Sequence, residues 1–341
     1  MNLKLKPLKE QVIVLTGASS GIGLTTARMA AKEGAKLVLA ARNEDALDKL
    51  VQEIRHNGGQ AIFVGADVGI EEDVMRIAEA AIATFGGFDT WANIAGVSIF
   101  GHCLDVSIPD MKHMFDTNFW GVVYGSRIAA NHFIKRGSPG AVINVGSFFG
   151  NRAAPIQSTY SASKYALHGW TDALRMELEK DKAPVSVTLI HPGRIDTPYN
   201  EHARSYMDRQ PEHRGMVYVP DTVADAILYA AATPKRDMFV GFQSKFFTVM
   251  AAISPRLMDK VMEVIMYPTQ LANRPSRDVE DNALYKPGYG MHERGTNVGW
   301  IRSGSVYVQA QKHPAVATLA VAGLGAAIAF LAGSRNRNKK F

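Results

Sequence analysis

Hydrophobic and polar positions alternate in a regular order between about residues 11 and 240. Short apolar runs rich in β-branched residues predict strands at 12–16, 36–41, 61–65, 90–94, 141–145, 185–190 and 238–240. Helical spacing separates these runs, at 22–33, 45–56, 72–85, 108–134, 159–179 and 222–232. Strands that are apolar throughout and alternate with helices are typical of a parallel sheet covered on both faces. The pattern therefore predicts a doubly wound α/β domain.

The last hundred residues lack this alternation. Residues 244–270 are amphipathic and rich in Met and Phe, which predicts a helical extension broken at Pro255. It either completes the core or covers a cleft, and a membrane-facing or substrate-lining surface is the alternative. Residues 271–313 contain many Gly, Pro, Asn and Arg residues and predict an extended linker. We therefore divide the chain into a domain at 8–243, the helical extension, the linker, a helix at 314–333 and a basic tail at 334–341.

The run 314–333 contains no charged residue. A helix of that length spans roughly 30 Å, about the hydrocarbon thickness of a bilayer, so we expect a transmembrane helix. Alanine and glycine fill much of the run, which leaves open a helix packed on the protein or lying in the interface. Arg335, Arg337, Lys339 and Lys340 follow it, and the orientation of such a span stays open. No apolar run precedes the first strand, so we expect no secretory signal peptide.

Composition narrows the functional classes. The 341 residues are 47% hydrophobic and 21% charged, which is typical of a globular chain and excludes a wholly disordered one. Cys103 is the single cysteine, so neither an internal disulfide nor a thiolate zinc cluster can form within the chain, and the histidines lack metal-ligand spacing. The net charge of +6 is concentrated near the two ends, without a basic stripe interleaved with aromatics. We therefore expect neither a metal nor a nucleic-acid partner.

A glycine-rich turn joins the first predicted strand to the first helix, with the sequence TGASSGIG at 16–23. Glycines let the backbone approach a pyrophosphate closely, and the helix that follows offers free N–H groups and its positive dipole end. This position, between a strand and a helix, is the one that Rossmann-type dinucleotide-binding folds use. The predicted cofactor contacts here are Gly17, Ser19, Ser20, Gly21, Ile22 and Gly23.

The end of the second strand indicates which dinucleotide binds. NAD-binding domains tend to place an acid there for the ribose 2′-hydroxyl, whereas a 2′-phosphate requires a cation. This strand ends with Ala41, Arg42 and Asn43, so the acid is missing and a guanidinium stands in its place. We expect NADP(H) to be preferred, with NAD(H) as the alternative. Arg42 could also be a solvated loop residue, and Asn43 could cap the next helix.

Three further residues form a catalytic hypothesis. Tyr160 and Lys164 lie four residues apart in a predicted helix, and Ser147 follows the strand at 141–145. A phenol with a pKa of about 10 is a poor acid–base group at neutral pH, but a neighbouring ammonium and an oxidised nicotinamide stabilise its phenolate. Ser147 can then hold the substrate oxygen while Tyr160 gives or takes its proton.

These motifs together resemble the short-chain dehydrogenase/reductase family, in the subgroup that uses TGxxxGxG and YxxxK. The resemblance covers roughly residues 8–240 and implies further contacts. It implies an adenine contact at Asp67 and Val68, a cofactor-binding NNAG-like element at Asn93, Ala95 and Gly96, and a proton-relay role for Asn118. It also implies a nicotinamide carboxamide contact at Pro192, Gly193, Ile195 and Thr197. Family members of this subgroup end earlier, so the helical C-terminal extension is a departure.

The residues and the resemblance lead to one functional expectation. We expect an NADP(H)-dependent oxidoreductase that interconverts a carbonyl and a secondary alcohol. Its catalytic residues are Asn118, Ser147, Tyr160 and Lys164, and Ser147 also binds the substrate. Aromatic residues near the cleft suggest a lipophilic small-molecule substrate. We further expect a homo-oligomer with a cytoplasmic catalytic domain, anchored by the C-terminal helix. The alternative is a membrane-tethered NADP-binding sensor or scaffold without turnover.

Overall fold

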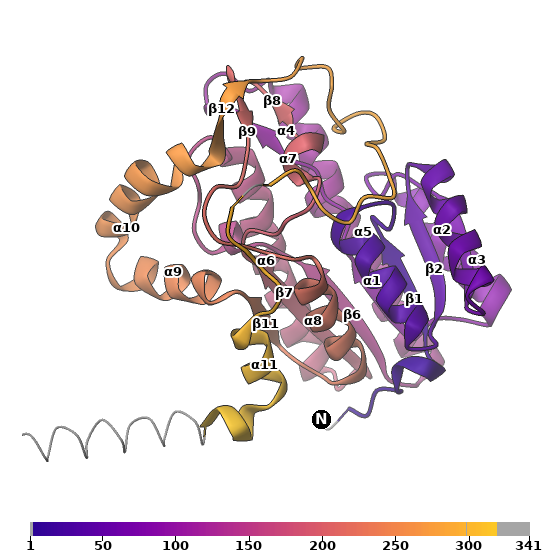
Figure 1. The fold of residues 1–341 in the computed structure, drawn as a ribbon. Coiled ribbons are helices and arrows are strands. Elements are labelled where there is room, and N and C mark those ends of the chain that lie inside the picture. Colours follow the sequence, from indigo (N-terminus) through magenta and orange to yellow (C-terminus); the bar gives the residue numbers. More distant parts are fainter. Residues whose placement is uncertain (1–2, 298, 319–341) are drawn as a thin grey trace, which may run out of the picture.

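The computed structural model describes residues 3–297 and 299–318. Its centre is a seven-stranded parallel sheet in the order β11-β7-β6-β4-β1-β2-β3 (Figure 1). The strands are β1 (Val12–Thr16), β2 (Lys36–Ala41), β3 (Gln60–Gly65), β4 (Thr90–Asn93), β6 (Gly140–Val145), β7 (Val185–Pro192) and β11 (Asp237–Val240). The predicted Rossmann-type α/β fold is therefore confirmed.

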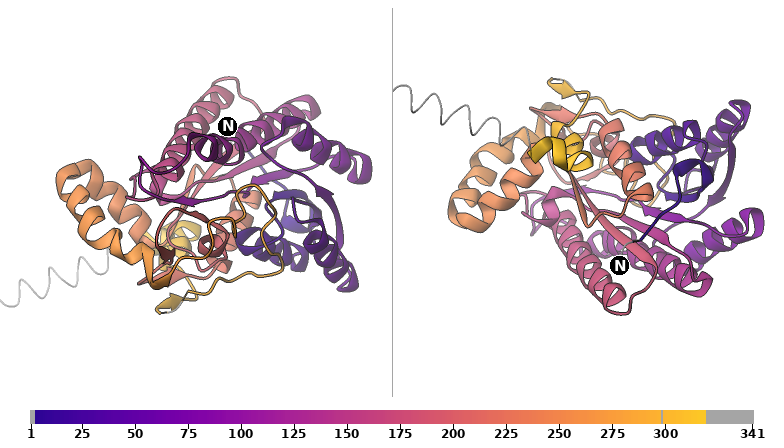
Figure 2. Two further views of the ribbon diagram at one scale, coloured as in Figure 1. Left: turned by 90° about the horizontal axis from the view of Figure 1, so that it is seen from above. Right: turned by 90° about the horizontal axis from the view of Figure 1, so that it is seen from below.

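Helices cover both faces of this sheet, and Figure 2 shows the sheet between the two layers. One layer contains α1 (Gly21–Lys32), α2 (Glu44–His56) and α8 (Asp221–Ala232). The other contains α3 (Glu71–Phe85), α5 (Gly121–Arg136) and α6 (Ser158–Lys180). Successive residues of β1 alternate between the layers, since Ile13 and Leu15 pack with the first and Val12 and Val14 with the second. Every residue of β1 is buried, which explains why the strand is apolar throughout.

The strand order reverses between β1 and β4. In such sheets a crevice opens beyond the carboxyl ends of the strands at this reversal, and ligands bind there. Short elements surround that edge: β5 (Ile99–Phe100), α7 (Tyr199–His202), β8 (Arg204–Ser205), β9 (Arg209–Pro211) and β10 (Val217–Tyr218). Two strands of the C-terminal part pair with them, since β12 (Leu271–Pro275) joins β9 and β13 (Ile301–Arg302) joins β10. The C-terminal part is thus built onto the edge where a ligand would bind.

The helix predicted at 108–134 is interrupted. It consists of α4 (Ile108–Phe115), a π-helical turn at Asp116–Trp120 and then α5. The wider turn places the buried side chain of Asn118 against Val97, where its amide makes hydrogen bonds in both directions with that backbone. Such π-turns are frequent at functional sites, because one residue is added without ending the helix.

The extension at 244–270 contains two helices, α9 (Phe242–Ile253) and α10 (Pro255–Val261), which are separated at Ser254 and project from the side of the body (Figure 1). The helix α10 continues into a π-turn at Met262–Met266, and a 3₁₀ turn follows at Pro268–Gln270. One further helix, α11 (Val306–Lys312), packs beside β11.

The structure gives only a partial view of the predicted helix at 314–333. Its residues from 319 onward, and the tail at 334–341, lie outside the described residues. Among the residues that are described, no helix combines the length and the apolar character needed to cross a membrane.

Candidate active site

The turn after β1 brings backbone close to backbone. A Cβ on Gly23 would lie 2.1 Å from the carbonyl oxygen of Gly17, and one on Gly17 would lie 2.8 Å from Cα of Ala95. Gly17 also has a φ of +68°, a conformation that other residues rarely adopt. The Thr16 hydroxyl accepts hydrogen bonds from the amides of Ile94 (3.0 Å) and Ala95 (3.2 Å), which ties the end of β1 to the end of β4. The sequence thus folds into a tight cradle ahead of the α1 N-terminus.

A cleft opens from this cradle along the carboxyl ends of the strands. Its lining includes most of the predicted residues: Gly17, Ser19, Ser20, Gly21, Ile22, Gly23, Arg42, Asp67, Val68, Ala95, Gly96, Ser147, Tyr160, Lys164, Pro192, Gly193, Ile195 and Thr197. Predictions that were separated by up to 180 residues in sequence therefore meet in one cavity. Phe148, Phe149 and Tyr199 line it as well.

Two predicted residues do not line this cleft. Asn93 is buried behind it, where its amide nitrogen donates to Asn144 Oδ1 at 2.9 Å and its oxygen accepts from the Trp91 indole at 2.8 Å. Its side chain therefore connects β4 to β6, and its contact with a cofactor stays a prediction. Asn118 is also fully buried, and its amide donates to Val97 O and Ser163 Oγ. Its carboxamide oxygen would lie 3.4 Å from a Cβ on Gly96, one layer behind the lining.

Tyr160 stands at the centre of the lining. The hydroxyls of Ser147 and Tyr199 are the polar groups that act on its hydroxyl. The Tyr160 and Tyr199 rings meet edge to face with centroids 5.5 Å apart. Ser147 caps a 3₁₀ turn at Phe148–Gly150, and its Oγ accepts from the amide of Phe149 at 3.1 Å. Both hydroxyls are therefore held in place by protein before any ligand is considered.

Lys164 lies one helical turn beyond Tyr160 and is 4% exposed. Its ammonium donates to the carbonyl of Val145 at 3.0 Å and lies 5.7 Å from the centroid of the Tyr160 ring. Burial lowers the pKa of Lys164 to about 8. The pKa of Tyr160 is raised by burial, although the hydroxyls of Ser147 and Tyr199 act in the opposite direction. The phenol therefore stays protonated at neutral pH, and the lowering by Lys164 and an oxidised nicotinamide stays a prediction.

A segment of the C-terminal part, residues 283–297, crosses the cleft, and we call it the crossing segment. Arg42 donates to the carbonyls of Leu284 (2.9 Å) and Ala283 (2.6 Å), and Asn43 donates to that of Gly288 (2.8 Å). Arg42 also lies 3.8 Å from Asp67. Burial lowers the pKa of Arg42, opposed by the charge of Asp67. The sequence did not predict these partners.

The crossing segment also reaches the glycine-rich turn. The amide of Gly21 donates to the carbonyl of His292 at 2.9 Å, and the amide of Met291 donates to that of Ser19 at 2.8 Å. Glu293 forms an ion pair with Arg28 of α1. In Figure 1 the orange chain can be followed from β12 across to α1. The expected linker thus has little regular structure, but it is packed against the body.

Some lining residues were missed by the sequence. They are Ala283, Pro287 and Gly288 of the crossing segment, together with His202 and His213. His213 stacks on Tyr199, and burial, aided by the charge of Arg194, lowers its pKa to about 3. None of these residues stands in a recognisable motif, so only the tertiary structure identifies them. Within the described residues, no group of His, Cys, Asp and Glu side chains could hold a metal ion.

The cradle fits a dinucleotide on its geometry. The glycines let the turn close tightly on its own backbone and on Ala95, α1 begins at the turn, and Arg42 and Lys164 place two cations in the lining of the cleft. Tyr160 and Ser147 line the same cleft as Lys164. The arrangement can hold an anionic cofactor and exchange a proton with an oxygen atom placed next to it.

Comparisons with known proteins agree with this geometry. Residues 11–208 match the family model described as short chain dehydrogenase. The uncharacterized oxidoreductase YxnA of Bacillus subtilis is 63% identical over 336 residues, covering 98% of this chain and 94% of that protein. The protein named "Putative oxidoreductase SadH" of Mycobacterium tuberculosis is 34% identical over 250 residues, covering 71% of this chain and 90% of its own length.

A solved structure of a short chain dehydrogenase/reductase from Burkholderia phymatum, in complex with NAD, superposes with a TM-score of 0.64. It is 26% identical and covers 80% of this chain and 100% of its own. An alcohol dehydrogenase from Thermococcus sibiricus shares the fold, with a TM-score of 0.59 over 67% of this chain and 95% of its own. The chain therefore belongs to the short-chain dehydrogenase/reductase family of nicotinamide-dependent oxidoreductases.

Proposed function

We propose that this enzyme interconverts a carbonyl and a secondary alcohol with NADP(H) as the preferred cofactor. The observation that carries the proposal is that the hydroxyls of Tyr160 and Ser147 meet in one cleft with the buried ammonium of Lys164, and that this cleft begins at a glycine cradle. A phenol and a hydroxyl together can bind one carbonyl oxygen, which is what a reduction requires.

The protein's own groups divide the work as follows. Ser147 and Tyr160 donate hydrogen bonds to the substrate oxygen, and Tyr160 delivers the proton that this oxygen needs when it becomes a hydroxyl. The bound nicotinamide supplies the hydride for the carbonyl carbon, or takes it in the reverse direction. The positive charge of Lys164 stabilises the negative charge that forms on the Tyr160 oxygen when its proton leaves, and the same ammonium binds ribose hydroxyls. Asn118 holds the backbone of Val97 and the hydroxyl of Ser163 behind Lys164, which fits the proposed relay of protons to Tyr160.

Arg42 supports the choice of NADP(H). Its guanidinium is half-buried at the end of β2, next to the cleft, and the acid that faces it is Asp67 at 3.8 Å. Two of its N–H groups donate to the carbonyls of Ala283 and Leu284, and a planar cation with further N–H groups suits the 2′-phosphate, whereas a ribose diol would need a carboxylate in hydrogen-bonding distance. Asp67 and Val68 line the same end and are proposed to contact adenine, while Pro192, Gly193, Ile195 and Thr197 are proposed to contact the carboxamide.

A lipophilic substrate fits the other end of the cleft. Phe148 and Phe149 pack with Met258, Met262 and Met266 of the helical extension, and this apolar cluster contacts Tyr160. Methionine and aromatic side chains give an adaptable apolar wall, which suits a ketone with a hydrocarbon body. The extension therefore supplies part of the apolar surface next to the reacting groups.

We also propose that the outer face of α9 and α10 contacts a lipid bilayer. Val249, Ile253 and Leu257 are 43%, 71% and 55% exposed, and Val264 and Ile265 continue this apolar face. Lys245, Arg256 and Lys260 lie on the same helices and can meet anionic headgroups. A flotation assay with liposomes should recover the full chain, and the double variant Ile253→Glu/Leu257→Glu should lose most of that binding. Removal of residues 314–341 tests separately whether the C-terminal run anchors the chain.

A homo-oligomer is proposed on the exposed apolar side chains of the opposite layer. Ile134 of α5 and Met176 of α6 are 46% and 64% exposed, and Tyr165 is also exposed. Sedimentation equilibrium of the detergent-solubilised chain should give a mass that is a multiple of 37.1 kDa. A monomer at micromolar concentration would contradict it.

The chemistry is tested by NADPH oxidation with a panel of aliphatic and aromatic ketones. Tyr160→Phe removes the proton donor and should lower kcat by about 10²–10⁴-fold, the usual contribution of a general acid. Binding of NADPH, measured by its fluorescence, should persist in this variant. Wild-type rates in Tyr160→Phe would remove Tyr160 from its role. Tight NADPH binding with no turnover of any carbonyl would favour the sensor or scaffold.

A further inference from the structure

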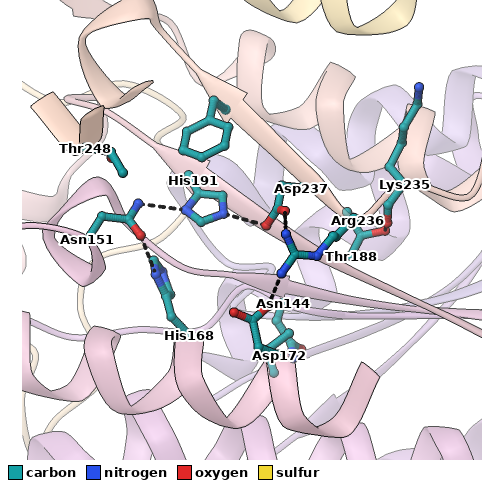
Figure 3. Close-up of polar contacts among 12 residues, drawn as sticks. Asn144, Asn151, His168, Asp172, Thr188, His191, Lys235, Arg236, Asp237 and Thr248 are labelled. Atoms are coloured by element: carbon teal, nitrogen blue, oxygen red, sulfur yellow. Dashed lines mark hydrogen bonds and ion pairs between the residues drawn. The ribbon is translucent and has the colours of Figure 1, made fainter. Parts of the chain in front are cut away.

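A chain of four polar side chains lies behind Ser147, and the proposed reaction uses none of them. Figure 3 shows His168, Asn151, His191 and Asp237 following one another. The Ser147 amide donates to His168 Nε2 at 3.3 Å, and His168 Nδ1 lies 3.2 Å from Asn151 Oδ1. Asn151 Nδ2 lies 3.0 Å from His191 Nδ1, and His191 Nε2 lies 3.0 Å from Asp237 Oδ1. The chain thus connects α6, the loop after β6, the end of β7 and the start of β11.

The donors and acceptors along this chain have one consistent direction. The Ser147 amide can only donate, so Nε2 of His168 accepts and a neutral ring carries its proton on Nδ1, facing the Asn151 oxygen. The Asn151 nitrogen then donates to Nδ1 of His191, whose proton stands on Nε2 and faces the Asp237 carboxylate. Every link therefore has one donor and one acceptor when both imidazoles are neutral.

Packing leaves the His168 ring little freedom. A Cβ on Gly146 would lie 2.3 Å from His168 Nε2, and one on Gly150 would lie 2.5 Å from its Cε1. The imidazole therefore fills the space that glycines leave on both sides of Ser147. His191 is stacked on Phe239 with centroids 4.2 Å apart and meets His168 edge to face at 4.8 Å. His168 and His191 are 7% and 4% exposed.

The surrounding charges support the same protonation state. His168 faces the ammonium of Lys164 and the imidazole of His191, and among the described residues the anion that acts on it is the Asp237 carboxylate. Burial first, and these two groups second, hold the pKa of His168 well below its usual value. Asp237 also pairs with Arg236, and Arg236 pairs with Asp172 of α6. A proton on His168 Nε2 would point at the Ser147 N–H, so the neutral ring is required.

We propose that His168, Asn151, His191 and Asp237 are positioning residues that fix Ser147, and with it the substrate oxygen, relative to the nicotinamide-binding turn. His191 immediately precedes Pro192 and Gly193, so the chain connects the two walls of the reactive end of the cleft. His168 is also on the face of α6 that carries Tyr160 and Lys164, at four-residue intervals. This inference rests on the proposed carbonyl–alcohol function.

Kinetics with NADPH and 2-decanone distinguish positioning from simple stability. His168→Gln keeps an acceptor for Ser147 and a donor for Asn151, whereas His168→Leu fills the space without either group. We expect kcat to fall by ~30-fold or more in the leucine variant, to stay within ~3-fold in the glutamine variant, and the KM for NADPH to change little in both. Asp172→Asn, which removes a neighbouring carboxylate outside the chain, is the matched control and should keep the wild-type rate. Equal rates for the leucine and glutamine variants, with both folded, would overturn the proposal.

A second measurement does not need turnover. In the ¹⁵N spectrum of histidine-labelled protein at pH 7, His168 should carry its proton on Nδ1 and His191 on Nε2. The ¹⁵N–¹H signal of the Ser147 amide should move in Asp237→Asn and stay in place in Asp172→Asn. The opposite tautomers, or a Ser147 signal that ignores Asp237, would overturn the chain. A wild-type enzyme that fails to reduce 2-decanone while the spectra agree would count against the proposed function and leave the chain standing.

Discussion

Two parts of this protein meet at the cofactor cleft, and they reach it in different ways. The turn at 16–23 is local, because its strand, glycines and helix follow one another in the chain. The crossing segment arrives from far away, and Arg42 meets Ala283 and Leu284 across more than 240 residues. The turn is positioned by the strand and helix next to it in the chain, whereas the crossing segment is positioned by contacts with residues far from it in the sequence. A local motif is therefore visible in the sequence, and a segment held by distant contacts is not.

The largest effect on cofactor binding and stability is expected in the glycine-rich turn, where backbone packs closely against backbone. Gly23→Ala would place a Cβ 2.1 Å from the Gly17 carbonyl oxygen, and backbone cannot move aside cheaply. We expect loss of NADPH binding and a decrease of about 2–4 kcal/mol in the free energy of unfolding. Fluorescence titration and urea unfolding measure both.

Gly169→Ala is the matched control for that change. Gly169 lies in α6 with no atom within 4 Å of an added Cβ, and its φ is ordinary. Alanine there should stabilise the helix by about 0.5–1 kcal/mol and leave NADPH binding unchanged. A similar loss of NADPH binding and stability in both variants would show that the cradle does not specifically require glycine at position 23.

Arg42 contacts both parts of the molecule, since it lines the cofactor cleft and also binds the crossing segment. We expect Arg42→Ala to lower kcat/KM for NADPH by about 10–100-fold, as the loss of charged hydrogen bonds worth about 1.5–3 kcal/mol implies. Initial rates with NADH should stay within ~3-fold. Arg55→Ala is the control, because Arg55 also donates to a backbone carbonyl, that of Ala61, away from the cleft. Equal losses with both cofactors would make Arg42 a residue that only holds the segment.

Lys164 connects the local framework to pH. Its pKa of about 8 lies below the ordinary value of 10.5 because of burial, so the unfolded chain binds more protons between pH 8 and 10.5. Stability should therefore rise with pH in that window, by up to about 3 kcal/mol. Because the pKa of Tyr160 is raised, its phenol stays protonated in the folded protein over this window. The contribution of Tyr160 to the free energy of unfolding is lost only above pH 10.

Lys164→Met tests this sign directly. Urea unfolding at pH 7.5 and 9.5 should show a gain in the wild type that is absent in the variant. Lys235→Met is the control, since the Lys235 ammonium donates to the carbonyl of Gln311 outside the cleft. If the free energy of unfolding falls between pH 7.5 and 9.5, and falls equally in the wild type and in Lys164→Met, the role given to the burial of Lys164 is contradicted.

Sequence patterns predicted the strands of the sheet, the order of elements along the chain and many of the residues that line the cleft. They could do so because strand periodicity, the glycine turn and the four-residue spacing are all local patterns. Two other features were not foreseen. The cofactor contact of Asn93 stays a prediction, but the sequence did not reveal that its side chain, at the end of a buried strand, would bond to Asn144 and Trp91. Helical periodicity at 108–134 could not reveal the π-turn, because the extra residue leaves the apolar spacing nearly intact.

The packing of 283–297 was beyond the sequence for a different reason. Some of its contacts are backbone carbonyls and amides, as at Ala283, Gly288 and His292, and these groups are the same in every residue. Others join side chains such as Tyr285 and Glu293 to residues far away in the sequence. Composition alone therefore predicts a linker, and only the donors on the body, such as Arg42 and Asn43, decide that it is held.

The smallest effect is expected from a single ion pair that joins the two parts. Arg28 of α1 binds Glu53 of α2 and Glu293 of the crossing segment, with distances of 2.7 and 2.8 Å between the paired atoms. All three side chains are about one-third exposed, so either pair is worth at most about 1 kcal/mol. Glu293→Gln should speed hydrogen exchange at the Gly21 and Met291 amides, which bond across the boundary, while global stability changes little. Glu53→Gln removes a pair of equal exposure within the body and should leave those two amides protected as in the wild type. Equal exchange in the two variants would mean that the ion pair of Glu293 with Arg28 does not hold the crossing segment.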